Sequence, residues 1–469
     1  MSKIKNRQEI LSHGDAESRK IVLDITERML EKADSYDRIR KMMRVEGSIL
    51  HIGEKTWDLS KKKHVYLLGA GKACNAMVMA VESVLGEWLT KGIAIVKILE
   101  EDDHYTKTDV YVGGHPLPNI DGAHACEKIL QLVDQAEADD LFIAVISGGS
   151  TALMACPVPG ISLEDKIQTT DIMLKSGAKV YEINTVRRHL SQMNGGRLGQ
   201  RIQKKGAELI GITIFDDVGK PATEDITIPV DLEGTPIGPD KTTFVQALQA
   251  INNYDLEDRL PASVIEYLKN QTPENETPKK IDGFTYYIIN TVPDSCRYAK
   301  EAAEEMGLNT MVLTTYLEGD SRSMGTCLAS IAREIQQNNS PIAAPCVILA
   351  SGETTTLILD NSQIKGHGGP SQELVTSFAL SAAAIPGACA LSMDSEGTDG
   401  TTDAAGGITD STSLSTAVKG GMDMMQALRE HATGELLSAI GDQVITGNTG
   451  TNLCDFNILY VPGCNYPQT

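Results

Sequence analysis

Short apolar runs rich in β-branched residues alternate with helical segments along most of this 469-residue chain. This alternation is typical of βαβ units, in which helices cover both faces of a mostly parallel sheet. We therefore predict an α/β fold, preceded by about sixty residues that we expect to be helical. The predicted strands are 64–68, 92–96, 110–112, 141–146, 209–215, 284–290, 311–315, 346–350, 388–393, 444–446 and 457–460.

One polar segment interrupts the alternation. Residues 271–280 (QTPENETPKK) hold two prolines and four charges, a composition that favours a linker. The sequence thus predicts two α/β domains, 1–275 and 276–469. The cleft between two such domains is a common place for a small-molecule site, and we expect the active site there.

Composition excludes several classes of function. Lys and Arg number 42 against 63 Asp and Glu, and the net charge of −21 argues against nucleic-acid binding by bulk charge. The most apolar stretch, 378–393, is interrupted by Pro386 and Gly387, so no membrane span is expected. Nine scattered cysteines without a C-x-x-C pair favour a reducing, cytoplasmic location. The sequence leaves open whether the protein forms a homodimer.

Glycine-rich turns follow three of the predicted strands. In open α/β sheets ligands bind beyond the carboxyl ends of the strands, and glycine lets a phosphate approach the backbone closely. Three turns of this kind together favour phosphate binding over plain tight turns. They contain Gly69, Gly71 and Lys72; Ser147, Gly148, Gly149 and Ser150; and Ser351, Gly352 and Glu353.

The first of these turns invites a dinucleotide-binding interpretation, which the following strand does not support. A Rossmann site needs an acidic residue at the end of that strand to hold the ribose, and Lys97 stands there. No G-x-x-x-x-G-K-[ST] motif occurs either. Lys72, directly after two glycines, remains a candidate partner for phosphate.

Two polar clusters supply candidates for substrate binding. Arg187 and Arg188 are adjacent on a predicted helix and point about 100° apart, so we expect at most one to face the site. Arg197 follows a Gly-Gly pair. Basic residues in a chain of this charge indicate a carboxylate or phosphate partner. Asp217, in the pair that ends strand 209–215, suits a general base or a metal ligand.

The C-terminal half carries further glycine-rich turns. Residues 394–406 combine four carboxylates with three glycines, which indicates oxygens near a phosphate-bound Mg²⁺, with Asp399, Asp403 and Glu353 as candidate ligands. Thr449 and Gly450 belong to a turn, 446–452, that suits phosphate. His367 lies in another such turn, 365–373, before a predicted helix.

As a set, these strings resemble one family, the glycerate 2-kinases with a C-terminal MOFRL domain, over about residues 10–460. The matching strings are GAGKA (69–73), GGHPLP (113–118), SGGSTAL (147–153), SGAKVYEINTVRRHLSQMNGGRL (176–198), DDVG (216–219), SGETT (351–355), GTDGTTDAAG (397–406) and TGNTGTN (446–452).

The resemblance implies a Rossmann-like N-terminal domain and a MOFRL segment at about 345–460. It also implies ATP- and Mg²⁺-dependent phosphorylation of a small hydroxy acid, D-glycerate first. Lys72, Asp217 and Arg187 would be catalytic. Arg188, Arg197 and His367 would bind substrate, and the glycine turns with Thr449 and Gly450 would hold the nucleotide.

The sequence departs from the family pattern at one turn. His367 and Pro370 stand where the family has two arginines, which implies weaker binding of D-glycerate. Three alternatives stay open: an NAD(P)H-dependent hydroxypyruvate reductase, a kinase for another sugar acid, and a silent binding protein.

Overall fold

The computed structural model describes residues 2–358 and 361–463. Its contacts divide the chain into two compact units. Unit 1 contains residues 1–34, 215–223 and 290–469, and unit 2 contains residues 35–214 and 224–289. The predicted boundary at residue 275 differs from this division, because the chain enters unit 1 for the last time at residue 290, inside strand β9 (Thr285–Thr291).

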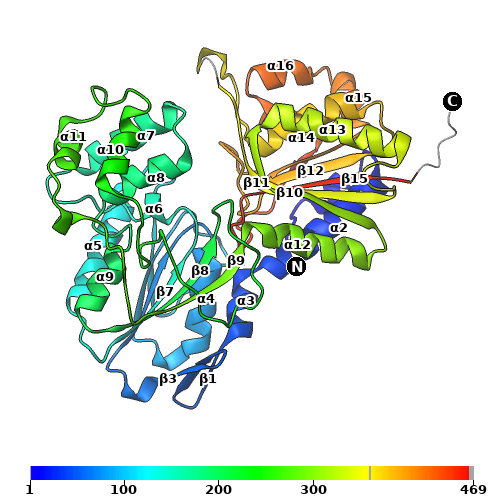
Figure 1. Cartoon of the computed structure of the whole chain (residues 1–469). Coiled ribbons are helices and arrows are strands. Elements are labelled where there is room, and N and C mark those ends of the chain that lie inside the picture. The colour runs from blue at the N-terminus through cyan, green and yellow to red at the C-terminus, as the bar shows by residue number, and fades with distance from the viewer. Residues whose placement is uncertain (1, 359–360, 464–469) are drawn as a thin grey trace. The chain divides into compact units, whose positions relative to one another are not determined.

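Unit 2 is built on a six-stranded sheet in the order β6-β5-β4-β7-β8-β9. Strands β4 to β8 are mutually parallel, as the alternation of strands and helices predicted. Helix α4 covers one face of this sheet, and α5 and α9 cover the other (Figure 1). The strands are β4 (Val65–Ala70), β5 (Lys91–Val96), β6 (Thr108–Val112), β7 (Leu141–Ile146), β8 (Glu208–Phe215) and β9.

The helices of unit 2 fall into two groups. Those beside the sheet are α3 (Ser35–Met42), α4 (Cys74–Leu85), α5 (Ile120–Asp134), α6 (Ser150–Leu153) and α9 (Arg197–Lys204). Four others share an apolar core that includes Met173, Val186 and Val264. These four are α7 (Leu163–Lys175), α8 (Val180–His189), α10 (Phe244–Asn252) and α11 (Ala262–Lys269).

Two expectations about unit 2 are corrected. Residues 43–58 form a three-stranded antiparallel sheet, not helix, with turns at Gly47 and Gly53 whose φ angles are +62° and +56°. Its strands are β1 (Met43–Glu46), β2 (Ile49–Ile52) and β3 (Lys55–Asp58). Segment 271–280 is packed within unit 2, because Glu276 accepts hydrogen bonds from His189 and from the Phe244 amide.

Unit 1 holds a mixed six-stranded sheet in the order β10-β11-β15-β12-β13-β14. Strands β10 and β11 are parallel, and each other neighbouring pair is antiparallel. The strands are β10 (Asn309–Asp320), β11 (Cys346–Thr355), β12 (Cys389–Asp394), β13 (Gly406–Asp410), β14 (Gln443–Val444) and β15 (Asp455–Val461). Strand β13 was missed, since its two glycines conceal a β pattern.

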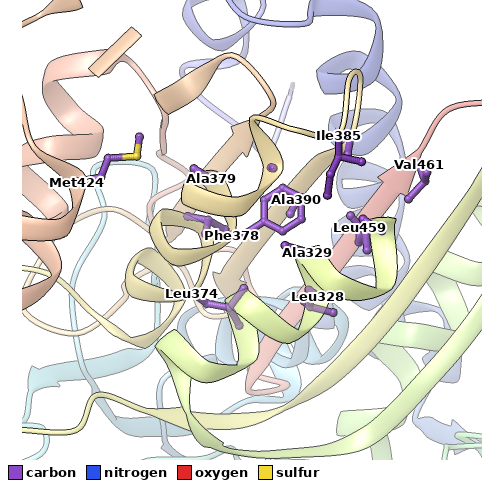
Figure 2. Packing of buried hydrophobic residues seen from close by; sticks show 14 of the residues in the cluster. Leu328, Ala329, Leu374, Phe378, Ala379, Ile385, Ala390, Met424, Leu459 and Val461 are labelled. Atoms are coloured by element: carbon purple, nitrogen blue, oxygen red, sulfur yellow. The ribbon is translucent and has the colours of Figure 1, made fainter. Parts of the chain in front are cut away.

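Helices cover both faces of the unit 1 sheet (Figure 1). The N-terminal helix α2 packs with α12 against β15 and β11, and therefore belongs to unit 1. On the other face, Leu328, Phe378 and Leu459 meet in a buried core between α13, α14 and β15 (Figure 2). The helices are α1 (Arg7–Ile10), α2 (Ala16–Ala33), α12 (Val292–Glu305), α13 (Ser321–Asn338), α14 (Pro370–Ala382), α15 (Ser413–Lys419), α16 (Met424–Arg429) and α17 (Thr433–Ile440).

Within the described part of the chain, none of the helices combines the length and apolar character that crossing a bilayer requires.

Candidate functional site

Two glycine turns of unit 2 lie against each other, because the strands that precede them, β4 and β7, are parallel neighbours. The Lys72 amide donates to the carbonyl of Gly148 at 2.9 Å, and the Ala73 amide donates to the Ser147 hydroxyl at 3.0 Å. A Cβ on Gly71 would lie only 2.1 Å from that hydroxyl oxygen, so this approach requires glycine. The parallel pairing of β4 and β7 therefore places these two turns side by side.

Gly69 has a different task from the other glycines of these turns. It lies inside β4, where a Cβ would come within 2.7 Å of a methyl group of Val78 on α4. Gly69 therefore lets helix α4 approach the sheet. Gly149 has a φ of +82° and precedes α6, whose first residue is Ser150.

Four residues form what we call the Lys72 group: His115 and the three cations whose charges act on it, Lys72, Lys97 and Arg187. A Cβ on Gly149 would lie 2.9 Å from Cγ of Lys72 and 3.2 Å from Cδ2 of His115. Burial, together with the charges of Lys72, Lys97 and Arg187, holds the pKa of His115 well below its usual value. His115 is therefore neutral at pH 7 and lies near three cationic side chains.

Arg187 is the most informative member of the group. Its side chain donates to the carbonyl of Pro116 at 3.0 Å and to the amide oxygen of Asn184 at 3.3 Å. The residue is 9% exposed, its Nε has no hydrogen-bond partner, and no described carboxylate pairs with it. Burial lowers its pKa to about 10. A buried cation without a counter-ion is costly, which favours an anionic ligand at this place.

The neighbouring arginines are placed differently. Arg188 forms an ion pair of 3.5 Å with the buried Asp240, which gives it a structural partner. Arg197 begins α9 and donates to the carbonyl of Asn275 at 2.9 Å, in a separate pocket described below. Only Arg187 of the three predicted arginines therefore joins Lys72.

Unit 1 carries a second polar group, made of carboxylates. Asp394 ends β12 and is paired in register with Asp455, the first residue of β15, which in turn is paired with Gly352 of β11. Burial and the charges of Asp394, Asp399 and Glu353 raise the pKa of Asp455 well above its usual value. Three adjacent strands thus bring these carboxylates together.

The three predicted metal ligands, Glu353, Asp399 and Asp403, do not all lie beside Asp455. Asp399 is buried, and its oxygens accept hydrogen bonds from the amides of Ser371 and Gln372, at 3.2 and 2.9 Å, at the start of α14. Burial raises its pKa to about 7. Asp403 is exposed. Among the described residues, no three His, Cys, Asp or Glu side chains lie close enough to hold a metal ion by themselves.

Asp216 and Asp217 follow β8 and belong to unit 1. The Asp216 carboxylate accepts a hydrogen bond of 2.9 Å from Asn452, and its carbonyl accepts one of 2.8 Å from the Cys454 thiol. Asp217, the predicted base, is exposed. Hydrogen bonds therefore hold Asp216 in place, whereas Asp217 is exposed to solvent.

The remaining predicted residues lie in turns of unit 1. The Thr449 hydroxyl donates to the carbonyl of Ser395, and the Gly450 amide donates to Asn448 at 2.9 Å, so these donors have internal partners. His367 is exposed and its Nδ1 lies 2.8 Å from a carboxylate oxygen of Glu435.

Sequence reasoning missed His115 as a site residue, although GGHPLP follows β6 at the same edge as the glycine turns. It also missed Asp455, because a single aspartate at the start of a strand carries no motif. Strand order alone brings it beside Asp394.

Comparisons with known proteins agree with these features. Residues 21–269 match the family described as Domain of unknown function (DUF4147), and residues 346–455 match the MOFRL family, close to the predicted segment 345–460. The chain is 33% identical over 441 residues to a glycerate 2-kinase from Pyrococcus horikoshii, covering 93% of this chain and 95% of that protein.

A curated sequence and a crystal structure from Thermotoga maritima are also similar to this chain. A D-glycerate 2-kinase is 34% identical over 394 residues, which cover 84% of this chain and 90% of that protein. The crystal structure of a glycerate kinase superposes with a TM-score of 0.74 at 31% identity, over 94% of this chain and 99% of that one. The predicted fold class and resemblance are thereby confirmed, and the chain belongs to the glycerate 2-kinase family, with an N-terminal DUF4147 region and a C-terminal MOFRL region.

Proposed function

We propose that this chain is an ATP-dependent kinase that phosphorylates the 2-hydroxyl of D-glycerate. The observation that carries the proposal is Arg187, a buried guanidinium without a carboxylate partner, whose charge acts on His115 together with that of Lys72. D-glycerate and ATP are both anions, and in a chain of net charge −21 they need a local cationic site.

Phosphoryl transfer asks little covalent chemistry of the protein and depends on positioning and charge neutralisation. The glycerate hydroxyl oxygen attacks the γ-phosphorus, the bond to the bridging oxygen of ADP breaks, and the hydroxyl proton is released. Lys72 and Arg187 stabilise the negative charge of phosphate and carboxylate. Asp217 is our candidate to accept the proton.

Mg²⁺ is part of the proposal and would enter with the nucleotide. It usually keeps several waters and binds one or two carboxylates together with phosphates. Burial first, and then the charges of the neighbouring carboxylates, raise the pKa of Asp455, and a bound cation would offset that repulsion. One or two of the carboxylates of Asp455, Asp394 and Glu353 would bind the Mg²⁺ ion, and the phosphate oxygens and water would supply its other ligands. The ion would shield the phosphate oxygens from these carboxylates.

The alternative reductase needs a dinucleotide site. The residue after β5, where an acid would hold the ribose, is Lys97, which favours the kinase.

The test is a coupled ADP-release assay with D-glycerate, L-glycerate, hydroxypyruvate and no acceptor. We expect ADP release that depends on D-glycerate, and 2-phosphoglycerate as the product by ³¹P NMR. NADH oxidation with hydroxypyruvate would instead support the reductase. Thermal stabilisation by D-glycerate without turnover would support a silent binding protein, and turnover of a longer acid alone would change the substrate assignment.

A further inference from the structure

A pocket of about 570 Å³ lies in unit 2 beside helix α9. Its lining shares no residue with the Lys72 group, and its volume is in the range of small-molecule sites. The lining residues are Val158, Pro159, Gln192, Arg197, Gln200, Arg201, Lys204, Tyr267 and Asn275.

The charge of this pocket is positive. Arg197, Arg201 and Lys204 lie four and then three positions apart on α9, so they share one side of the helix. No acidic residue lines the pocket. In a chain with 21 more acidic than basic residues, three cations facing a cavity without an acid are unusual.

Two of these cations donate hydrogen bonds to neutral groups only. Arg197 donates to the carbonyl of Asn275, its Nε is buried without a hydrogen-bond partner, and burial lowers its pKa. Lys204 donates to the amide oxygen of Gln200 at 3.1 Å. Arg201 alone is neutralised, through a bidentate contact with Asp134 at 2.7 and 2.5 Å. Glu276 and Asp240 attract Arg197 from outside the lining, but no carboxylate lies in the lining itself, so the wall that a ligand would contact is positively charged.

The remaining wall is mostly uncharged. Tyr267 packs edge-on against Phe244 with ring centroids 6.1 Å apart, and Val158 and Pro159 add apolar surface. A ligand with a small apolar or ring portion next to its charged groups would fit both halves of the lining.

We propose that this pocket is a second anion-binding site, separate from the Lys72 group, which takes a multiply charged small molecule such as a phosphate ester or a polycarboxylate. The rigid helix α9 presents Arg197, Arg201 and Lys204 to the ligand's charges, and Tyr267 contacts its carbon skeleton. This assignment does not rest on the proposed kinase activity.

Binding is measured by isothermal titration calorimetry with pyrophosphate and with citrate, which probe phosphate and carboxylate chemistry separately. The titrations use the full chain carrying Lys72→Met, so that the Lys72 group contributes less. We expect one of the two anions to bind this background. Adding Lys204→Glu should raise its Kd at least about tenfold, which is ~1.4 kcal/mol.

A matched control carries Lys61→Glu, which makes the same change of charge at an exposed position of unit 2 outside the pocket. A second variant, Gln200→Glu, places a carboxylate in the lining and removes no cation. Both pocket variants are first checked for an unchanged melting temperature without ligand. Equal Kd values in Lys204→Glu, Gln200→Glu and Lys61→Glu, or no binding in the Lys72→Met background, would overturn the proposal.

Discussion

Arg187 donates a hydrogen bond to the carbonyl oxygen of Pro116, 3.0 Å away, and this neutral oxygen stands where a buried arginine normally has a carboxylate. Its neighbour Arg188 does have one, Asp240. Two adjacent arginines on one helix therefore differ in what their charge costs the folded protein.

That difference predicts opposite effects on stability. Arg187→Met removes an uncompensated buried charge, so we expect an equal or higher melting temperature together with a loss of about 100-fold or more in kcat/KM. Arg188→Met leaves Asp240 buried without its cation and should lower the melting temperature. Calorimetry and the ADP-release assay measure both. A lower melting temperature for Arg187→Met would mean that Arg187 is structural.

Lys72 is the second member of the group to test. If its ammonium stabilises phosphate charge, Lys72→Met should lower kcat/KM by about 100-fold and leave the melting temperature nearly unchanged, because its backbone contact to Gly148 persists. Lys91→Met, an exposed lysine of the same unit, is the control. Near-normal turnover in Lys72→Met would show that the half-buried Lys72 does not take part in phosphoryl transfer.

Glu435 lies where it would pair with an arginine introduced at position 367. The family has an arginine where His367 stands, so on the sequence alone His367→Arg would be expected to strengthen D-glycerate binding. Since Glu435 already holds the amide and the ring of His367, we expect it to pair with the new arginine, so that KM changes little. His367→Arg combined with Glu435→Gln should lower KM several-fold, because the guanidinium is then unpaired. A strong effect of the single variant would show that Glu435 does not compete.

Lys166 predicts a pH-dependent stability. Its side chain is buried, its Nζ has no hydrogen-bond partner, and burial lowers its pKa to about 8. Below pH 8 folding must bury its charge, and between pH 8 and its unfolded value, about 10.4, the unfolded chain binds more protons, so this penalty shrinks as pH rises. Lys166→Met should therefore stabilise the protein by roughly 1–3 kcal/mol at pH 7, and less at pH 10. Urea unfolding at both pH values tests this, and a stabilisation that does not fall with pH would contradict it.

The carboxylates of unit 1 can bind Mg²⁺ or cap helix α14, and we expect Asp455 to have the first role and Asp399 the second. Both oxygens of Asp399 accept hydrogen bonds at the start of α14. Asp455 accepts hydrogen bonds through Oδ2, from the amide and the hydroxyl of Thr354, and lies among other carboxylates. We expect Asp455→Asn to raise the Mg²⁺ concentration for half-maximal activity several-fold and Asp399→Asn to leave it unchanged. Asp399→Ala should lower the free energy of unfolding by about 1 kcal/mol through the lost cap. A larger Mg²⁺ effect in Asp399→Asn than in Asp455→Asn would restore the sequence-based assignment.

The parts of the fold that local pattern controls were predictable. The parallel strands β4, β5 and β7 are short apolar runs, each bounded by turns, and such runs indicate strands wherever they occur. Residues 43–58 were misjudged, because strands of four residues joined by tight turns at Gly47 and Gly53 carry too few positions to show a period of two.

The sequence by itself determined the glycine turns and the presence of Lys72 and of basic residues near 187. These depend on backbone freedom and charge, which a residue carries wherever it lies. Only the tertiary structure decided which arginine lacks a carboxylate, that His115 belongs with Lys72, and that Asp455 lies beside Asp394. Those relationships depend on strand order and on burial, because an interaction between charges depends on their separation and on the water excluded around them, and neither can be read from spacing along the chain.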